Sequence, residues 1–289
     1  MIMLKIILKE IRIKQYTKNF LVFAAPVFAG MLFEKGVFIY ILMTFLSFSF
    51  MASAVYILND IMDREKDRKH PVKRYRPIAA GLISLPLAWL MFLLLLTVSI
   101  GIAVFIKPAL VWLLIIYLFM NICYSIKFKY VVIIDVMIIA TGFVMRAYAS
   151  VLALDLVASE WFTLCIFMLS MFLALAKRRA ELILFVSAPS RRRKVLQDYS
   201  LELLNQMLSI VTAVSLTSYS LFALQADQSH NGISMMITIP FVVYGMMRYL
   251  YLIYIKGQGD TPEDVLLHDK GIFLTCILFS FVVIILRDL

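Results

Sequence analysis

The chain has 289 residues, of which 63% are hydrophobic and only 16% are charged. Soluble domains are about 45–50% apolar and about 25% charged, so this composition excludes an ordinary soluble protein and indicates a polytopic membrane protein. The formal net charge of +10 lies mostly between the apolar runs, where it indicates membrane topology, and we expect no nucleic-acid partner. The three cysteines lie far apart within apolar runs, a spacing that supports neither a disulfide framework nor a zinc site.

Nine apolar segments are long enough, or nearly long enough, to cross a bilayer. They are residues 19–33, 37–58, 86–106, 109–126, 131–152, 159–176, 204–225, 233–255 and 271–287. The first is short and contains Pro26. Residues 1–18 are amphipathic and basic and lack a small-residue cleavage site, which predicts an interfacial helix and not a signal peptide. We therefore predict an all-α bundle that forms one membrane domain over residues 1–289.

The distribution of Lys and Arg predicts the orientation of this bundle. If the nine segments cross the membrane in turn, 23 of the 28 Lys and Arg residues fall on the side of the N-terminus. The positive-inside rule makes that side cytoplasmic. The N-terminus is then inside and the C-terminus outside, which requires an odd number of spans and agrees with nine. The polar clusters lie on the same side, so we expect the chemistry there.

An acidic run follows the second predicted span. If this stretch is helical, Asn59, Asp60, Asp63 and Asp67 fall within an arc of about 100° on one face. Converging carboxylates repel each other unless something positive lies between them, and a hard divalent cation commonly fills that place. Mg²⁺ takes oxygen ligands, keeps several waters and is often shared with substrate phosphates. These residues therefore predict a magnesium site at the membrane boundary.

Three cations come directly after the acidic run. Lys73, Arg74 and Arg76 stand between Pro71 and Pro77, and such side chains suit the phosphates of a diphosphate. The alternative is a solvated, charge-mixed loop whose positive charges only set the topology. The order of the charges, carboxylates on one face followed by cations, favours the site over the loop.

Further polar residues stand at the ends of later spans. Lys177, Arg178 and Glu181 follow the sixth span, at the same predicted boundary as Asp60, so the two boundaries are expected to give one cavity a cation side and a metal side. The alternative for this cluster is topogenic positive charge. Lys127 and Lys129 close the fourth span and suit either a phosphate or snorkelling to headgroups.

The fifth span contains two charged residues. Asp135 and Arg146 are eleven residues apart and so lie nearly on one helix face. Charges within a span are costly and normally face the bundle interior or a wet cavity. Arg146 lies near the far leaflet, where snorkelling outward is the alternative, whereas Asp135 lies near the cytoplasm and is the better site candidate.

These motifs resemble a known family. An Asn-Asp-x-x-Asp-x-x-x-Asp motif after the second of nine spans resembles the UbiA superfamily of intramembrane prenyltransferases. The string that continues it from His70 to Gly81 is similar to one branch, the decaprenyl-phosphate phosphoribosyltransferases. Later stretches that resemble the branch are Tyr124-Ser125 with Lys127 and Lys129, Ile134-Asp135, Gly142-Phe143, Arg146-Ala147, Lys177-Arg178, Glu181 and the loop from Pro262 to Asp269. The resemblance covers nearly the whole chain.

The resemblance implies an activity and roles for residues. The implied reaction is Mg²⁺-dependent transfer of 5-phosphoribosyl from phosphoribosyl diphosphate to a polyprenyl phosphate, at the cytoplasmic face of a bacterial inner membrane. The implied catalytic residues are Asp60, Asp63, Asp67 and Lys177, and Asn59 joins the three aspartates as a metal ligand. The implied substrate-binding residues are Asn59, Lys73, Arg74, Arg76, Tyr124, Lys127, Lys129, Asp135, Arg146, Arg178 and Glu181.

One departure from the superfamily pattern separates the alternatives. Typical prenyl-transferring members carry a second aspartate-rich motif after the sixth span, where this chain has Lys177-Arg178-Arg179-Ala180-Glu181. The change removes a second metal site and adds cations, which suits a substrate with more phosphate. Prenyl transfer to a small acceptor is the alternative within enzymes. A transporter of anions or lipid phosphates is the alternative outside them, but it is disfavoured because the sequence has no internal repeat and no matching pair of broken spans.

Overall fold

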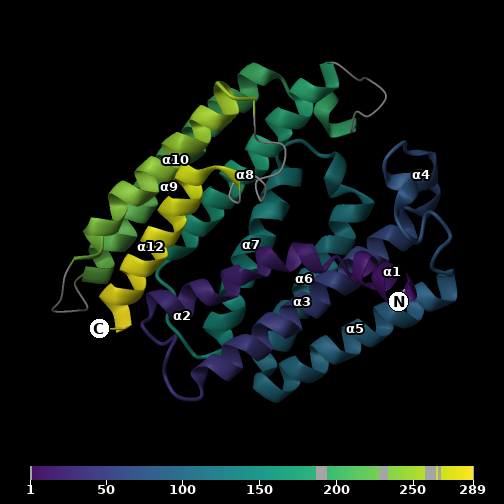
Figure 1. Cartoon of the computed structure of the whole chain (residues 1–289), viewed down its shortest axis with the longest axis horizontal. Helices are drawn as coiled ribbons and strands as arrows, with labels where there is room; N and C mark the ends of the chain where they lie inside the picture. Colours follow the sequence, from purple (N-terminus) through teal and green to yellow (C-terminus); the bar gives the residue numbers. More distant parts are fainter. Residues whose placement is uncertain (1, 187–193, 228–233, 258–264, 266–267, 289) are drawn as a thin grey trace. The chain divides into compact units, whose positions relative to one another are not determined.

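The computed structural model describes residues 2–186, 194–227, 234–257, 265 and 268–288, and in this part of the chain every regular element is a helix (Figure 1). The elements are α1 (Ile2–Ile11), η1 (Ile13–Phe23), α2 (Ala24–Phe28), α3 (Val37–Met62), α4 (Arg64–Lys69), η2 (Lys73–Tyr75), α5 (Leu85–Ile106), α6 (Pro108–Ile126), η3 (Phe128–Tyr130), α7 (Ile134–Ala153), α8 (Glu160–Val186), η5 (Lys194–Gln197), α9 (Leu201–Asp227), η6 (Met235–Thr238), α10 (Ile239–Tyr254) and α12 (Lys270–Asp288). The all-α prediction is confirmed.

Within the described residues, eight helical stretches are long and apolar enough to cross a membrane. They are α3, α5, α6, α7, most of α8 and α9, the run from η6 through α10, and α12. These stretches match the second to the ninth of the predicted segments. The chain is therefore a multi-pass membrane protein.

The first predicted segment, residues 19–33, takes a different form from the others. Its first part belongs to η1, an 11-residue 3₁₀ helix, and it continues into the five-residue helix α2, which contains the buried Pro26. A 3₁₀ helix rises about 2.0 Å per residue, so η1 and α2 together extend for about 30 Å, the thickness of a hydrocarbon core. The count of nine spans and the cytoplasmic N-terminus stay predictions.

The chain forms two compact units, each discontinuous in sequence. Unit 1 comprises Met1–Pro26, Glu34–Phe128 and Met145–Leu156, and unit 2 comprises Val27–Phe33, Lys129–Val144 and Val157–Leu289. Helix α7 therefore contributes its first half to unit 2 and its second half to unit 1. Single-domain organisation stays a prediction.

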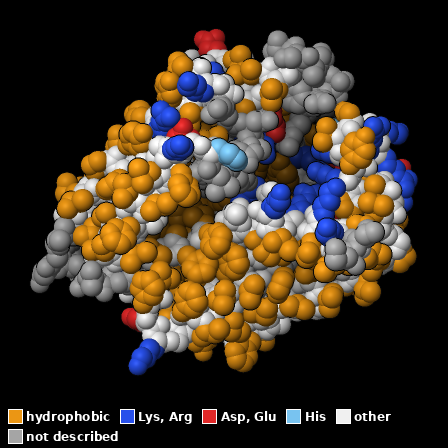
Figure 2. All heavy atoms as spheres, in the orientation of Figure 1, with side chains coloured by type: hydrophobic (Ala, Val, Ile, Leu, Met, Phe, Trp, Pro, Cys, Tyr) orange, Lys and Arg blue, Asp and Glu red, His pale blue; other side chains and the backbone are white. Residues whose placement is uncertain are grey.

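Unit 1 is built around α3, which packs against α1, η1, α5 and α6. The contact of α3 with α5 uses small side chains that let the backbones approach closely. Ser47 Oγ donates a hydrogen bond to the carbonyl of Ser99 at 2.8 Å, and Ser99 Oγ donates one to the carbonyl of Ser47 at 2.7 Å. Phe105 of α5 and Trp112 of α6 remain 75% and 66% exposed, as expected for side chains that face lipid. Apolar side chains cover much of the visible surface (Figure 2).

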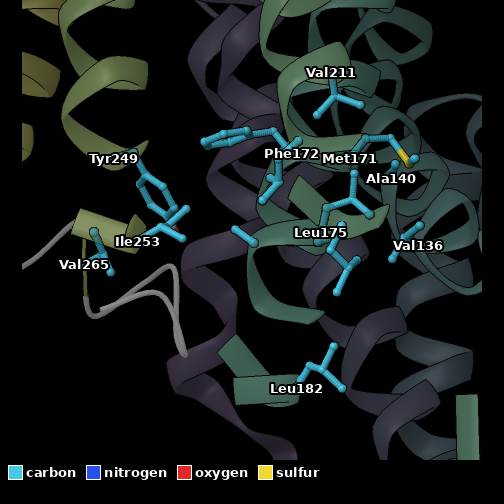
Figure 3. Close-up of a cluster of buried hydrophobic side chains, with 14 of the residues drawn as sticks. Val136, Ala140, Met171, Phe172, Leu175, Leu182, Val211, Tyr249, Ile253 and Val265 are labelled. Carbon is cyan, nitrogen blue, oxygen red and sulfur yellow. The ribbon is translucent and has the colours of Figure 1, made fainter. Parts of the chain in front are cut away.

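Unit 2 has its core among α7, α8, α9 and α10 (Figure 3). Phe172 and Leu175 of α8 are almost fully buried, and Val136 of α7 is fully buried in the same cluster. The ring of Phe172 meets the ring of Tyr249 of α10 edge-on at 5.3 Å between centroids. This apolar cluster fixes the part of α8 that precedes the charged residues Lys177 and Arg178.

A turn after α2 meets the end of α12 within unit 2. Gly30 has a φ of +67°, and a Cβ added there would lie 2.5 Å from the carbonyl oxygen of Arg287. A non-glycine residue in this left-handed conformation costs about 1–2 kcal/mol, and a contact of 2.5 Å with backbone forces the two segments apart.

We expect Gly30→Ala to lower the stability of the detergent-solubilised protein by about 2 kcal/mol or more, measured as a fall in Tm. Two matched variants separate the causes. Gly36→Ala, at a φ of +84° with open space around it, should show the conformational cost alone. Gly101→Ala, in α5 and also in open space, should leave Tm unchanged or raised. Equal Tm values for the Gly30 and Gly101 variants would contradict the close approach.

Candidate active site

Polar side chains line one face of α3 in unit 1. They are Ser49, Ser53, Tyr56 and Asp60, at spacings of four, three and four residues. The N-terminal segment lies along this polar stripe. Asn19 Nδ2 donates to Ser49 Oγ at 2.9 Å, and Ser53 Oγ lies 3.0 Å from the Tyr16 hydroxyl and donates to the carbonyl of Ile11 at 2.8 Å. These hydrogen bonds hold the end of α1 near the end of α3.

Arg12 joins the N-terminal segment to Asp60. It occupies a left-handed conformation, φ 58° and ψ 48°, at the turn between α1 and η1. Its guanidinium lies 4.7 Å from the ring centroid of Tyr56, and its Nη2 donates to both carboxylate oxygens of Asp60 at 2.6 and 2.5 Å. The left-handed turn costs about 1–2 kcal/mol, which the contact with a buried carboxylate offsets.

Asp60 and Asp67 share a second arginine. Each aspartate is only 3% exposed, and Arg76 Nη1 donates to Asp60 Oδ1 at 2.8 Å and to Asp67 Oδ2 at 2.7 Å. The two aspartates are seven residues apart, which is two helical turns, and they do share a face as predicted. The positive group between them in this structure is a guanidinium.

The acidic run is not one continuous helix. Helix α3 ends at Met62, Asp63 has φ −92° and ψ 5°, and α4 begins at Arg64. The backbone still follows the helical path, because the Asp63 amide bonds to the Asn59 carbonyl at 2.9 Å and the Asp67 amide to the Asp63 carbonyl at 2.8 Å. Aspartate disfavours helix interiors because its short side chain competes for backbone groups, which accounts for the break at this position.

Asn59 and Asp63, the other two residues of the predicted site, have different surroundings from Asp60 and Asp67. The Asp63 side chain is 27% exposed and lies 3.7 Å from Lys66, whereas Asp60 and Asp67 are buried. Asn59 Oδ1 accepts a hydrogen bond from Ser125 Oγ of α6 at 2.6 Å. The structure therefore brings together Asp60 and Asp67 on Arg76 and leaves Asp63 half-buried beside Lys66, and the roles of Asn59 and Asp63 as metal ligands stay predictions.

Glu10, in the last turn of α1, is a third buried carboxylate, beside Asp60. Its side chain is 1% exposed, and within the described part of the chain neither carboxylate oxygen accepts a hydrogen bond from a donor group, so its close polar neighbour is the carboxylate of Asp60. Burial, and next the negative charge of Asp60, raise the pKa of Glu10 to about 7, against the opposing charge of Arg12. Neither Glu10 nor Arg12 was predicted from the sequence, although the polar spacing in α3 indicates a face with partners.

The predicted cations of unit 1 lie on exposed or partly exposed turns. Arg74 Nη2 donates to the Tyr75 hydroxyl at 2.6 Å, and the backbone amide of Lys73 donates to His70 Nδ1 at 3.2 Å. Lys127 is exposed at the end of α6, and Tyr124 is half-buried one turn before it. Lys and Arg side chains gather on the part of the surface where Figure 1 draws α4 (Figure 2). Phosphate binding by these residues stays a prediction.

Arg146 is a buried cation of unit 1. It is 6% exposed, its Nε donates to Asn19 Oδ1 at 2.8 Å, and its Nη2 donates to the Tyr117 hydroxyl at 2.9 Å. The guanidinium also lies 5.1 Å from the ring centroid of Phe48. The side chain therefore faces the interior of the unit, and snorkelling outward is wrong. A substrate contact by Arg146 stays a prediction.

In unit 2, Arg178 pairs with two acidic residues. Arg178 is 2% exposed, and it donates from Nε to Asp135 Oδ2 at 2.7 Å and from Nη1 to Glu181 Oε2 at 2.8 Å. The other oxygen of Asp135 accepts from the Tyr199 hydroxyl at 2.9 Å, which in turn accepts from the Ile133 amide at 2.8 Å. Any substrate contact by these residues has to form beside this network.

The remaining predicted residues are also in unit 2. Lys177 is half-buried in α8, and Lys129 Nζ lies 5.4 Å from the ring centroid of Tyr130. The predicted opposition of Lys177 to the Asp60 cluster concerns two different units and stays a prediction. Most of the loop from Pro262 to Asp269 lies outside the described residues.

The acidic group of unit 1 has the donors that a hard cation requires. Over the described ranges, no three His, Cys, Asp or Glu side chains are arranged as a preformed metal cage. Mg²⁺ commonly uses only one or two carboxylates and takes its other ligands from water and phosphate. Asp60 and Asp67 supply buried carboxylates, and the orphaned oxygens of Glu10 lie beside Asp60. The residues fit a magnesium ion that displaces an arginine contact.

The raised pKa of Glu10 predicts how stability depends on pH in metal-free protein. A carboxyl whose pKa rises from 4.5 to about 7 on folding binds its proton more tightly in the folded state than in the unfolded state. Its contribution to the free energy of unfolding is therefore most favourable below pH 4.5 and is lost as pH rises through about 7. We therefore expect Glu10→Gln, in EDTA, to raise Tm at pH 8 clearly more than at pH 5. Glu65→Gln, at a side chain that is 72% exposed, is the control and should show the same small effect at both pH values. A change in Tm on Glu10→Gln that is the same at pH 5 and pH 8 would contradict a raised pKa of Glu10.

Comparison with known proteins places the chain in a family. Residues 23–262 match the UbiA prenyltransferase family. The decaprenyl-phosphate phosphoribosyltransferase of Corynebacterium glutamicum is 32% identical over 96% of this chain and 85% of its own length. The protein of the same name from Mycobacterium tuberculosis is 32% identical over 91% of this chain and 88% of its own length.

Solved structures agree in fold. A UbiA homologue from Archaeoglobus fulgidus bound to GPP and Mg²⁺ aligns with a TM-score of 0.73 at 18% identity, over 96% of this chain and 99% of that chain. A UbiA homologue from Aeropyrum pernix aligns with a TM-score of 0.69 at 12% identity, over 95% and 98% of the two chains. With the matches in sequence, these results confirm the resemblance carried by the acidic run and by the string after it. The chain belongs to the UbiA prenyltransferase family and is a multi-pass membrane transferase.

Proposed function

We propose that this enzyme transfers the 5-phosphoribosyl group from phosphoribosyl diphosphate to a polyprenyl phosphate and releases diphosphate. The support from comparison is that relatives 32% identical over most of the chain are decaprenyl-phosphate phosphoribosyltransferases. The observation that carries the proposal is the pair of buried aspartates, Asp60 and Asp67, gathered on Arg76 at the end of a membrane helix.

This cluster suits a diphosphate because it combines carboxylates with guanidinium groups. Arg12 and Arg76 donate to the carboxylates of Asp60 and Asp67 in positions that are 3% exposed to solvent. The same guanidinium groups would bind diphosphate oxygens in the way they bind these carboxylates. Lys73 and Arg74, on the neighbouring turn, add positive charge on the solvent side.

The reaction needs no general base. An oxygen of the lipid phosphate supplies the electron pair for the new bond to C1 of the ribose, and the bond from C1 to the diphosphate oxygen breaks with its electrons on diphosphate. The lipid phosphate is already anionic near neutral pH, so no proton has to be removed before attack. The protein's task is to bind both anions, to orient them and to stabilise the charge on the leaving group.

Asp60 and Asp67, with Asn59 and Asp63 of the same run, would hold the magnesium ion. Mg²⁺ bound to a diphosphate neutralises the charge that develops on the leaving group as the C1 bond breaks. Arg76 connects the two parts of this site, because it bonds to aspartates of both α3 and α4. We assign the site to the cytoplasmic side of a bacterial inner membrane, on the strength of the Lys and Arg distribution.

The acceptor lipid has to reach this site from the bilayer. Exposed apolar side chains of α5 and α6 offer a surface for its polyprenyl tail. From the resemblance to the family, we assign the phosphate end to Lys127, directly after α6, to Lys129 of η3 and to Lys177 of α8. The further substrate-binding residues that the resemblance implies are Tyr124, Asp135, Arg146, Arg178 and Glu181. The lipid's chain length does not enter this assignment.

Transfer of radiolabel from phosphoribosyl diphosphate into a lipid fraction, in membranes supplied with a polyprenyl phosphate and Mg²⁺, tests the proposal. We expect Asp67→Asn to lower the rate about 100-fold or more, because the site loses a ligand of the cation and of Arg76. Asp63→Ala should lower it as well. Asp155→Asn is the control, since the Asp155 side chain is 81% exposed and pairs with Lys107 away from the acidic run. Near-wild-type transfer by both site variants would refute the metal assignment.

Thermal shift separates the two enzyme hypotheses. We expect phosphoribosyl diphosphate with Mg²⁺ to raise Tm by several degrees, because a ligand at about 100 times its Kd stabilises the folded state by about 2.7 kcal/mol. Geranyl diphosphate with Mg²⁺ should raise Tm much less, because it lacks the 5-phosphate with which phosphoribosyl diphosphate can bind further Lys and Arg side chains. The reverse order would favour transfer of a prenyl group to a small acceptor.

A further inference from the structure

The buried side chain of Glu10 has no role in the function proposed above. It belongs to α1, outside the acidic run, and its nearest charged neighbours include Asp60, Arg12 and Arg76. It is 1% exposed, and within the described ranges no donor group bonds to either of its carboxylate oxygens, whose close neighbour is the carboxylate of Asp60. Buried polar atoms are almost always hydrogen-bonded, so this exception needs an explanation.

The surrounding hydrogen bonds fix Glu10 where it is. The carbonyl of Ile11, the next residue, accepts from Ser53 Oγ at 2.8 Å, and the guanidinium of Arg12 is held by Asp60. The end of α1 is thus attached to α3 at two consecutive residues. These contacts hold the backbone next to Glu10 against α3, and its side chain is buried there.

The two nearby arginines donate no hydrogen bond to Glu10. Arg12 and Arg76 donate to Asp60 and Asp67, so three carboxylates stand against two guanidinium groups in the cluster. An ionised carboxylate that is buried without a partner is costly, and two adjacent carboxylates without a cation repel each other. A divalent cation bound by Glu10 and Asp60 would offset both costs, and carboxylate oxygens are the ligands that such a cation prefers.

We propose that Glu10 is a further ligand of the divalent cation at the Asp60 cluster, supplied by the N-terminal helix and not by the acidic run. The inference rests on the proposed function and adds a protein ligand to the same metal site. It also gives α1 a role beyond lying at the membrane surface, because the cation then bridges α1 to α3. The competing explanation is that Glu10 stays protonated and serves only as a neutral hydrogen-bonding group beside Asp60.

Binding of Mn²⁺, followed by its electron paramagnetic resonance signal, tests the proposal on the purified full-length protein. Titrations are run with Mn²⁺ alone and with Mn²⁺ plus inorganic diphosphate. We expect Glu10→Gln to weaken Mn²⁺ binding about 10-fold or more, as expected for the loss of a ligand worth about 1.4 kcal/mol or more. Glutamine matches glutamate in shape and hydrogen-bonds as the protonated acid would, so it keeps a neutral role and removes only the anionic ligand.

The control variant is Glu65→Gln, which removes an exposed carboxylate from the neighbouring α4 and should leave Mn²⁺ affinity unchanged. Tm of Glu10→Gln in EDTA at or above the wild-type value shows that the variant is folded. Equal Mn²⁺ affinity of Glu10→Gln and wild type would overturn the proposal and leave the proposed transfer reaction untouched. Failure of the wild type to bind Mn²⁺ in either titration would overturn it as well. Loss of the proposed function itself has a different signature, the absence of label transfer into lipid by wild type.

Discussion

The buried carboxylate of Asp60 is the constraint on which the rest of unit 1 depends. At 3% exposure it needs positive partners, and it receives them from two distant parts of the chain, Arg12 before α3 and Arg76 after α4. Removing either partner would leave a buried charge insufficiently compensated, which typically costs 3–5 kcal/mol. Because both arginines must converge, the N-terminal segment and the loop after α4 are both drawn to the end of α3.

The same face of α3 attaches the N-terminal segment and carries the candidate site. Ser49 and Ser53 of α3 bind the N-terminal segment through hydrogen bonds, and Asp60, further along the same face, carries the charge chemistry. In a membrane helix such hydroxyl groups bind partner segments without a hydrophobic driving force. A site ligand that comes from the N-terminal segment is therefore positioned by the interaction that folds that segment onto α3, and site geometry follows from packing.

Periodicity and composition predict much of this arrangement. Eight predicted spans correspond to helices, and the spacing of Asp60 and Asp67 places them on one face, because both features depend only on residues close in sequence. Arg12 and Glu10 were not predicted, because Asp60, which lies beside both of them, is about 50 residues away in sequence and helical spacing does not reveal a tertiary contact. The spacing of Ser49, Ser53 and Tyr56 was the available signal, since hydroxyl groups repeated on one face of an apolar helix need partners. The break at Asp63 was missed because the main-chain hydrogen bonds continue almost without interruption.

The two charged clusters differ in how completely they are satisfied, and this difference indicates their roles. In unit 2, Asp135 receives Arg178 on one oxygen and Tyr199 on the other, and Arg178 also reaches Glu181. Such a network holds helices together and gains little from an added ion. In unit 1, over the described ranges, both oxygens of Glu10 are unsatisfied beside an aspartate that already shares its arginines. A buried carboxylate without hydrogen-bond donors lowers the stability of the folded protein. A ligand that bonds to its oxygens removes this destabilisation, but only while it is bound. A ligand that bonds to Glu10 would therefore gain binding free energy in unit 1, and the paired network of unit 2 holds α7 to α8, the helix that carries Lys177.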